Sequence, residues 1–132
     1  MDTAYNEKYR MLVGDNCLYP ICDLHLIGRT RRVPIVALVD SGATLSIFAI
    51  SAAQDAGVPL PKYPNYWIQF GSGLAAGRKV EVYVDLLGRR LRADAVFVER
   101  LPFRFALLGR GGVFAKFKRI AFCTDSYMTF DW

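Results

Sequence analysis

A carboxylate follows directly after an apolar run in ALVDSGATLSIF, residues 37–48. Asp40 ends that run, and Ser41 and Gly42 come next. Asp, Ser and Gly all favour turns, so the simplest interpretation is a strand that ends at the surface. The alternative is that the strand places Asp40 for acid–base chemistry, in which a carboxylate takes a proton from water.

The other residue types that carry chemistry form no comparable pattern. His25 alternates with leucines in an apolar segment, which indicates a structural histidine rather than a ligand or a base. The cysteines match no zinc spacing, and we interpret them as reduced thiols. They are Cys17, Cys22 and Cys123. We therefore expect no metal and no cofactor.

The composition limits the class of protein. A chain of 132 residues is long enough for one packed domain but too short for a two-lobed enzyme, so we expect residues 1–132 to form a single domain. The chain is 53% hydrophobic, which excludes a disordered chain. No apolar run approaches the roughly 20 residues that span a bilayer. The first ten residues also lack a signal-peptide pattern, so we expect a cytoplasmic protein with no membrane partner.

The net charge of +5 comes from short basic clusters. A basic excess can attract nucleic acid or acidic polypeptide. Two of the clusters lie where we expect hairpin turns, whose tips are usually solvated. Because no aromatic residues interleave with the clusters on the same face and no binding motif is recognisable, we predict no nucleic-acid partner. The clusters are Arg29, Arg31 and Arg32; Arg89, Arg90 and Arg92; and Lys116, Lys118 and Arg119.

Two-residue alternation and short apolar runs predict strands over most of the chain. The pattern predicts an all-β fold with one or two short helices. Turns are expected at residues 29–32, in the glycine-rich segment 71–77 and at Arg89 and Arg90. The expected strands are 19–28, 33–39, 66–70, 78–88, 91–99, 119–123 and 128–132.

A helix of about two turns is expected at residues 51–57. Ser51 and Gln54 have the spacing of a capping box, and Gly57 is a plausible C-terminal stop. A second short helix is expected in the latter half of residues 105–117. Residues 1–20 are an N-terminal extension to which the sequence assigns no role.

Taken together, the motifs resemble those of the retropepsin-like aspartic proteases, a family of single-domain retroviral and retroelement proteases with bacterial and cellular relatives. The matching segments are ALVDSGAT at 37–44 and ALLGR at 106–110, with FGSGLAAG at 70–77 in the place of the family's flap. The likeness extends from about Ile21 to the C-terminus. It implies a closed β-barrel with half an active site in each chain, completed in a homodimer.

The resemblance also implies a role for each matching residue. Asp40 would be catalytic, and with its twin it would share one proton, so that one carboxylate activates water while the other donates to the peptide carbonyl. Gly42 would let its backbone N–H approach the carboxylates, and the hydroxyl of Ser41 would bond across the dimer. The loop around Asp40 would comprise Ser41, Gly42, Ala43 and Thr44; the flap Phe70, Gly71, Ser72, Gly73 and Leu74; and the structural support Leu107, Leu108, Gly109 and Arg110.

Two features of the resemblance leave alternatives open. Viral enzymes often have an acid where this chain has Thr44, to pair with the arginine that corresponds to Arg110, whereas bacterial and cellular members commonly have Ala-Thr. Retroviral dimers are sealed by interleaved terminal strands, and residues 126–132 could pair at such an interface or cover the core. Candidate walls of the substrate groove are Leu38, Ala43, Thr44, Val98 and Leu107.

The sequence thus predicts an aspartic endopeptidase that acts as a homodimer on an extended polypeptide, which could include its own precursor. The alternative is a catalytically weak module of the same fold that dimerises or binds a partner. A third class, an unrelated basic β-barrel that binds nucleic acid, would show affinity that falls steeply with salt.

Overall fold

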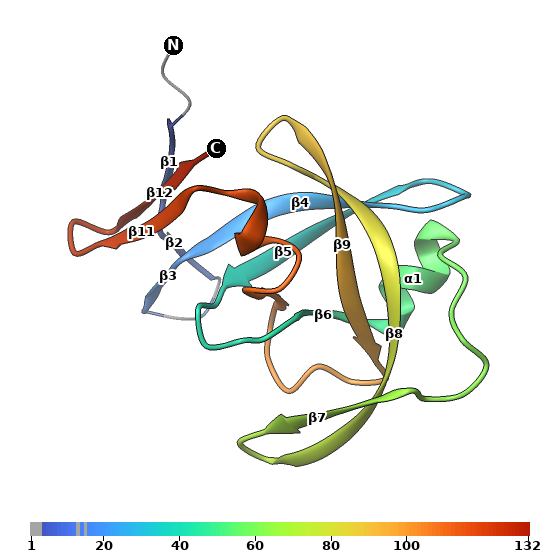
Figure 1. Ribbon diagram of the computed structural model, residues 1–132. Coiled ribbons are helices and arrows are strands. Elements are labelled where there is room, and N and C mark those ends of the chain that lie inside the picture. Colours follow the sequence, from blue (N-terminus) through green and yellow to red (C-terminus); the bar gives the residue numbers. More distant parts are fainter. Residues whose placement is uncertain (1–3, 13, 15) are drawn as a thin grey trace.

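The computed structural model describes residues 4–12, 14 and 16–132, and strands dominate it (Figure 1). One α-helix and one 3₁₀ turn accompany the strands in this part of the chain, which confirms the predicted all-β class. In chain order the elements are β1 (Ala4–Lys8), β2 (Arg10–Met11), β3 (Leu18–Tyr19), β4 (Ile21–Ile27), β5 (Arg32–Val39), β6 (Ser46–Ala49), α1 (Ile50–Ala56), β7 (Tyr66–Phe70), β8 (Gly73–Leu86), β9 (Arg89–Val98), β10 (Ala106–Leu108), the 3₁₀ turn η1 (Phe114–Lys116), β11 (Arg119–Cys123) and β12 (Tyr127–Asp131).

The main sheet closes on itself. Its strand order is β4-β5-β10-β6-β9-β8-β7, and β4 also pairs with β8, so six of its strands form a ring from which β7 extends. The closing pair is antiparallel and places His25 opposite Asp85. The strands β5 and β10 are parallel neighbours in the ring, with Val39 opposite Leu108. This pairing brings the two motif segments of the sequence together.

Strand alternation builds the core inside this ring. In β4 the side chains of Cys22, Leu24 and Leu26 are buried. Asp23, which lies between Cys22 and Leu24, is exposed, as expected for a strand with one face toward the interior. The main cluster of buried side chains extends from β4 to β12. A smaller cluster of Ile47, Val96, Val98 and Leu107 lies apart from it.

The helix is confirmed, but its predicted N-terminal cap is wrong. The helix begins at Ile50, one residue earlier than expected, and Ala49 occupies the N-cap position without a side-chain cap. Ser51 therefore lies inside the first turn, where its hydroxyl cannot act as the N-cap of a capping box with Gln54. Gly57 does end the helix: it adopts φ 78° and its N–H donates to the carbonyl of Ala53.

Two turns differ from the sequence prediction. The turn between β8 and β9 consists of Leu87 and Gly88, both with positive φ, and the arginines expected there belong to β9. This is the backbone that a two-residue hairpin turn needs, although a leucine adopts it rarely. Within the glycine-rich segment, only Gly71 and Ser72 form the turn, and residues from Gly73 onward belong to the long strand β8.

The two ends of the described chain meet in a separate three-stranded sheet of order β1-β12-β11 (Figure 1). Met128 and Phe130 on β12 are fully buried, so within the chain this strand covers the core. The N-terminal segment, to which the sequence assigned no structure, supplies β1 and the short β2–β3 hairpin. No helix in the described ranges is long and apolar enough to cross a bilayer.

Candidate active site

Asp40 stands at the end of β5, where Ala37 and Val39 are buried. The strand delivers it from Val39, which is 3% exposed, and the Asp40 N–H donates to the carbonyl of Leu108 at 3.0 Å. The N–H of Val39 donates to the carbonyl of Pro20 at 2.9 Å. Asp40 is therefore held from both sides while its own side chain is partly exposed.

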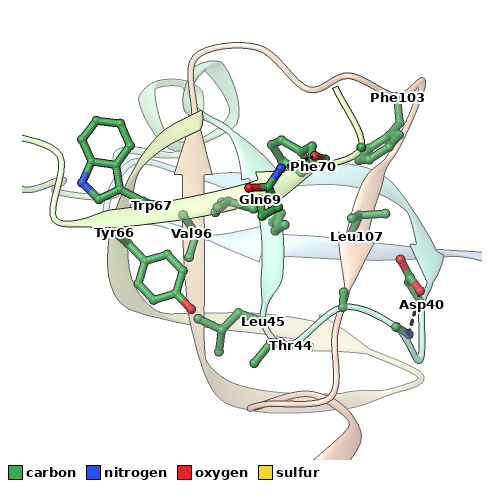
Figure 2. A pocket seen from close by; sticks show the side chains of 15 residues that line it. Asp40, Thr44, Leu45, Tyr66, Trp67, Gln69, Phe70, Val96, Phe103 and Leu107 are labelled. Atoms are coloured by element: carbon green, nitrogen blue, oxygen red, sulfur yellow. Dashed lines mark hydrogen bonds between the residues drawn. The ribbon is translucent and has the colours of Figure 1, made fainter. Parts of the chain in front are cut away.

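The loop after Asp40 fixes the direction of the carboxylate. The backbone N–H of Gly42 donates to Oδ1 of Asp40 at 2.8 Å, and the N–H of Ala43 donates to the Asp40 carbonyl at 3.2 Å (Figure 2). The bond from Gly42 holds one oxygen of the carboxylate in a fixed position. A Cβ on Gly42 would lie 3.2 Å from the same oxygen, which is why the smallest residue suits this place.

The ALLGR segment supports this loop mainly through its backbone. The N–H groups of Arg110 and Gly111 donate to the carbonyls of Ala43 at 2.9 Å and Thr44 at 2.7 Å. A Cβ on Gly109 would lie 2.4 Å from the Leu45 carbonyl oxygen, so only glycine fits between the two segments. The side chain of Arg110 is exposed.

Ser46 adds a buried contact that the sequence analysis missed. It is 1% exposed, and its Oγ accepts a hydrogen bond from the N–H of Gly109 at 3.1 Å. Ser46 follows an apolar residue in a short strand, and nothing in its local pattern marks it. Its role arises because β6 pairs with β10, which places Ile47 opposite Leu107.

A groove of about 380 Å³ opens between Asp40 and the β7–β8 hairpin (Figure 2). Asp40 is the acidic residue among those that line it, and most of the others are apolar or aromatic. In Figure 2 the strand β7 crosses above the floor, and Tyr66 and Trp67 point to opposite sides of it. The lining residues are Asp40, Gly42, Ala43, Thr44, Leu45, Ile47, Tyr66, Trp67, Ile68, Gln69, Phe70, Gly71, Val96, Phe103 and Leu107.

The β7–β8 hairpin contacts the loop that joins β9 to β10. The rings of Phe70 and Phe103 meet edge to face, with centroids 5.7 Å apart. This contact lies at the tip of the hairpin, directly before the turn at Gly71 and Ser72. The contact joins the two segments at one end of the groove.

The structure brings only some of the predicted site residues to the groove. Asp40, Gly42, Ala43, Thr44, Phe70, Gly71 and Leu107 line it. Ser41, Ser72, Gly73 and Leu74 do not line it; Ser41, Ser72 and Leu74 are exposed. Leu108 and Gly109 are buried and do not line the groove.

Two of the predicted groove walls are wrong. Val98 is 1% exposed and belongs to the small buried cluster, and Leu38 packs against that cluster. Neither residue lines the groove, whereas Val96, which shares the face of Val98 on β9, does. The sequence did hold a signal for some of the missed residues: Tyr66 and Ile68 share the face of Phe70 on an alternating strand.

The cysteines and the histidine lie away from the groove. Among the described residues, no group of three His, Cys, Asp or Glu side chains could hold a metal ion. Burial raises the pKa of the Cys22 thiol to about 12, so at neutral pH it stays protonated. His25 is half-buried on β4, opposite Pro34 on one side and Asp85 on the other.

Comparison with solved structures shows the fold. A retropepsin-like aspartic protease from Rickettsia conorii superposes with a TM-score of 0.63 at 16% identity, covering 96% of this chain and 90% of that one. The EIAV protease in complex with the inhibitor HBY-793 gives a TM-score of 0.56 at 17% identity, covering 76% of this chain and 88% of that one. The Simian Foamy Virus (mac) protease gives a TM-score of 0.51 at 18% identity, covering 75% of this chain and 97% of that one.

No protein-family model matches the sequence, and no curated protein matches it significantly. The three superpositions nevertheless agree, and each of the matched chains is covered over most of its length. The chain therefore has the retropepsin-like aspartic protease fold.

Proposed function

We propose that this chain is an aspartic endopeptidase that acts as a homodimer on extended polypeptides. One observation carries the proposal. A carboxylate at the end of β5, oriented by the Gly42 N–H, faces a largely apolar groove in a retropepsin-like fold. The chain supplies one such carboxylate, and a second copy related by a two-fold axis would supply the other.

The proposed chemistry needs one ionised and one protonated Asp40. Two carboxylates a hydrogen bond apart share a proton, because ionising both is unfavourable. The ionised Asp40 takes a proton from a water molecule, whose oxygen attacks the peptide carbonyl carbon. The protonated partner donates its proton to the carbonyl oxygen. When the tetrahedral intermediate collapses, the C–N bond breaks and the amine nitrogen receives a proton from the pair.

The groove suits an extended peptide. Such a peptide would lie along the β7–β8 hairpin as an added strand, held by backbone hydrogen bonds, with alternate side chains in pockets. The side chains of Ile47, Ile68 and Leu107 favour an apolar residue beside the scissile bond. The hairpin would act as a flap whose closure excludes water during the reaction.

Cleavage by an Asp40→Asn variant tests this proposal. The substrate is a denatured protein or a peptide library, incubated between about pH 3.5 and 7, where a shared proton is available. We expect the rate to fall by about 1,000-fold or more, because asparagine cannot take the proton from water. Asp94→Asn, which changes an exposed acid on β9, is the matched control and should retain activity.

The concentration dependence of the rate tests the dimer. Cleavage by wild type should rise more than linearly with enzyme concentration until the dimer is saturated. A wild-type chain that is folded and dimeric but as inert as Asp40→Asn would contradict the proposal. That outcome would favour the alternative of a catalytically weak binding module with the same fold.

A further inference from the structure

The terminal sheet gives the C-terminal strand no free edge. β12 is paired along its length on both sides, with Met128 opposite Glu7 on β1 and opposite Phe122 on β11. A partner's strand could add only at the outer edges of β1 or β11. Exposed charged side chains at Lys8 and Arg119 disfavour such pairing. In this fold β12 therefore cannot pair with a partner's strand, and charged side chains disfavour pairing at the two outer edges.

The β2–β3 hairpin lies against the segment that carries Asp40. Pro20, directly after β3, accepts the hydrogen bond from the N–H of Val39, the residue before Asp40. Leu18 is two residues before Pro20, roughly 7 Å along an extended chain. Figure 1 shows the hairpin beside the end of β5, where the Asp40 loop begins. A second chain that brings its own Asp40 to this loop approaches next to the hairpin.

Side-chain contacts join the strands of this hairpin to the rest of the fold, yet β2 and β3 present an apolar pair to solvent. Met11 and Leu18 are cross-strand partners, and they are 60% and 48% exposed. The neighbouring Tyr19 packs its ring on Phe105 with centroids 5.3 Å apart, which turns Leu18 to the opposite face. Arg10 donates two hydrogen bonds to Asp23 on β4, at 3.0 and 3.2 Å. Nothing in the fold of a single chain requires apolar residues at these two positions.

We propose that Met11 and Leu18 form the apolar centre of the homodimer interface. The inference rests on the proposed function, because it is the single Asp40 that makes a second copy necessary. The contact is isologous, so each hairpin packs on the same surface of the partner around the two-fold axis. A stable interface buries about 800 Å² on each partner. Ser41 and Gly42 of the Asp40 loop are exposed as well and are available to a second copy.

Sedimentation velocity of the full chain over a range of concentrations tests the interface. Leu18→Asp and Met11→Asp should each raise the dimer dissociation constant by about 30-fold or more, because each dimer would bury two unpaired carboxylates. Tyr63→Asp is the matched control: Tyr63 is exposed on the segment before β7 and should not alter the constant. Circular dichroism and thermal melting establish that each variant is folded.

A cleavage assay on the same samples separates the inference from the proposed function. Activity of Leu18→Asp that is lost at low concentration and restored at high concentration supports both. If Leu18→Asp dissociates the dimer but the wild-type dimer never cleaves peptide, the result supports the interface and contradicts the proposed protease activity. Leu18→Asp with wild-type dissociation overturns the interface, and dissociation by Phe122→Asp instead would identify the terminal sheet. A wild-type chain that stays monomeric at every concentration also overturns it.

Discussion

The Asp40 carboxylate is oriented by its own chain before any partner is present. The Gly42 N–H holds one oxygen at 2.8 Å, and the Asp40 N–H is bonded to β10 behind it. In the proposed mechanism this preorganisation would favour catalysis, because the geometry of the carboxylate is fixed before the reaction begins. The partner would then supply a second group, and the loop would not need to reorganise.

A substitution at Gly109 tests how tightly the Asp40 loop packs against the ALLGR segment. A Cβ at this position would lie 2.4 Å from the Leu45 carbonyl oxygen, and the three atoms nearest to it all belong to the backbone. We expect Gly109→Ala to lower the free energy of unfolding by about 3 kcal/mol, the upper end for a single substitution. Urea denaturation followed by fluorescence measures this change.

Gly71→Ala is the control, because nothing lies within 4 Å of the added methyl group. Its effect should stay within about 0.5 kcal/mol. Equal stability of the two alanine variants would show that the Asp40 loop and the ALLGR segment can separate without cost, against the packing described above.

At the scale of elements, the β7–β8 hairpin is secured at its tip by one aromatic contact. Phe70 meets Phe103, which belongs to a loop between two other strands of the ring. An edge-to-face pair contributes about 0.5–1.5 kcal/mol beyond its buried area. This is enough to favour a closed hairpin while still allowing it to open.

Phe103→Ala should loosen that hairpin. We expect amide hydrogen exchange in residues 66–74 to become about fivefold faster, which corresponds to a loss of about 1 kcal/mol. Phe122→Ala on β11 is the control, because Phe122 is exposed to 42% and Phe103 to 41%. Unchanged exchange in the Phe103 variant would mean that other contacts hold the hairpin.

At the scale of the whole molecule, a cluster of charged side chains lies where β4 and β8 close the ring. Asp85 on β8 accepts two hydrogen bonds from Arg90 on β9, at 2.8 and 3.1 Å, and pairs with Arg32 on β5 at 3.2 Å. The hydrogen bonds from Arg90 lower the pKa of Asp85 below its ordinary 3.8. The cluster joins the β4–β5 and β8–β9 hairpins where β4 meets β8.

Stability should depend on pH through this carboxylate. Because its pKa is lower in the folded state, Asp85 stabilises the fold above its ordinary pKa of 3.8, and this stabilisation is lost as the pH falls through the folded value. Asp85→Asn should therefore be less stable than wild type in urea at neutral pH, and the difference should shrink in acid. Glu99→Gln, at an exposed site, is the control. A difference that is constant with pH would rule out this linkage.

The sequence predicted those features of the fold that depend on residues close together in the chain. The strands, the Gly57 stop and the Asp40 loop follow from alternation and turn residues, and all appear in the structure. Ser46 could not be predicted, because its importance comes from a hydrogen bond to Gly109, 63 positions away. Likewise, β1 carries no clear alternation, and its pairing with β12 depends on the opposite end of the chain.

That last pairing has a consequence for how the chain acquires its structure. Asn6 and Thr129 share a side-chain hydrogen bond although they are 123 positions apart. During synthesis β1 leaves the ribosome before β12 and has no partner strand in the sheet until β12 follows. Contacts this distant in sequence must wait for nearly the whole chain, and they slow folding. The terminal sheet is therefore the part of the molecule that we expect to form last, after the ring that carries Asp40.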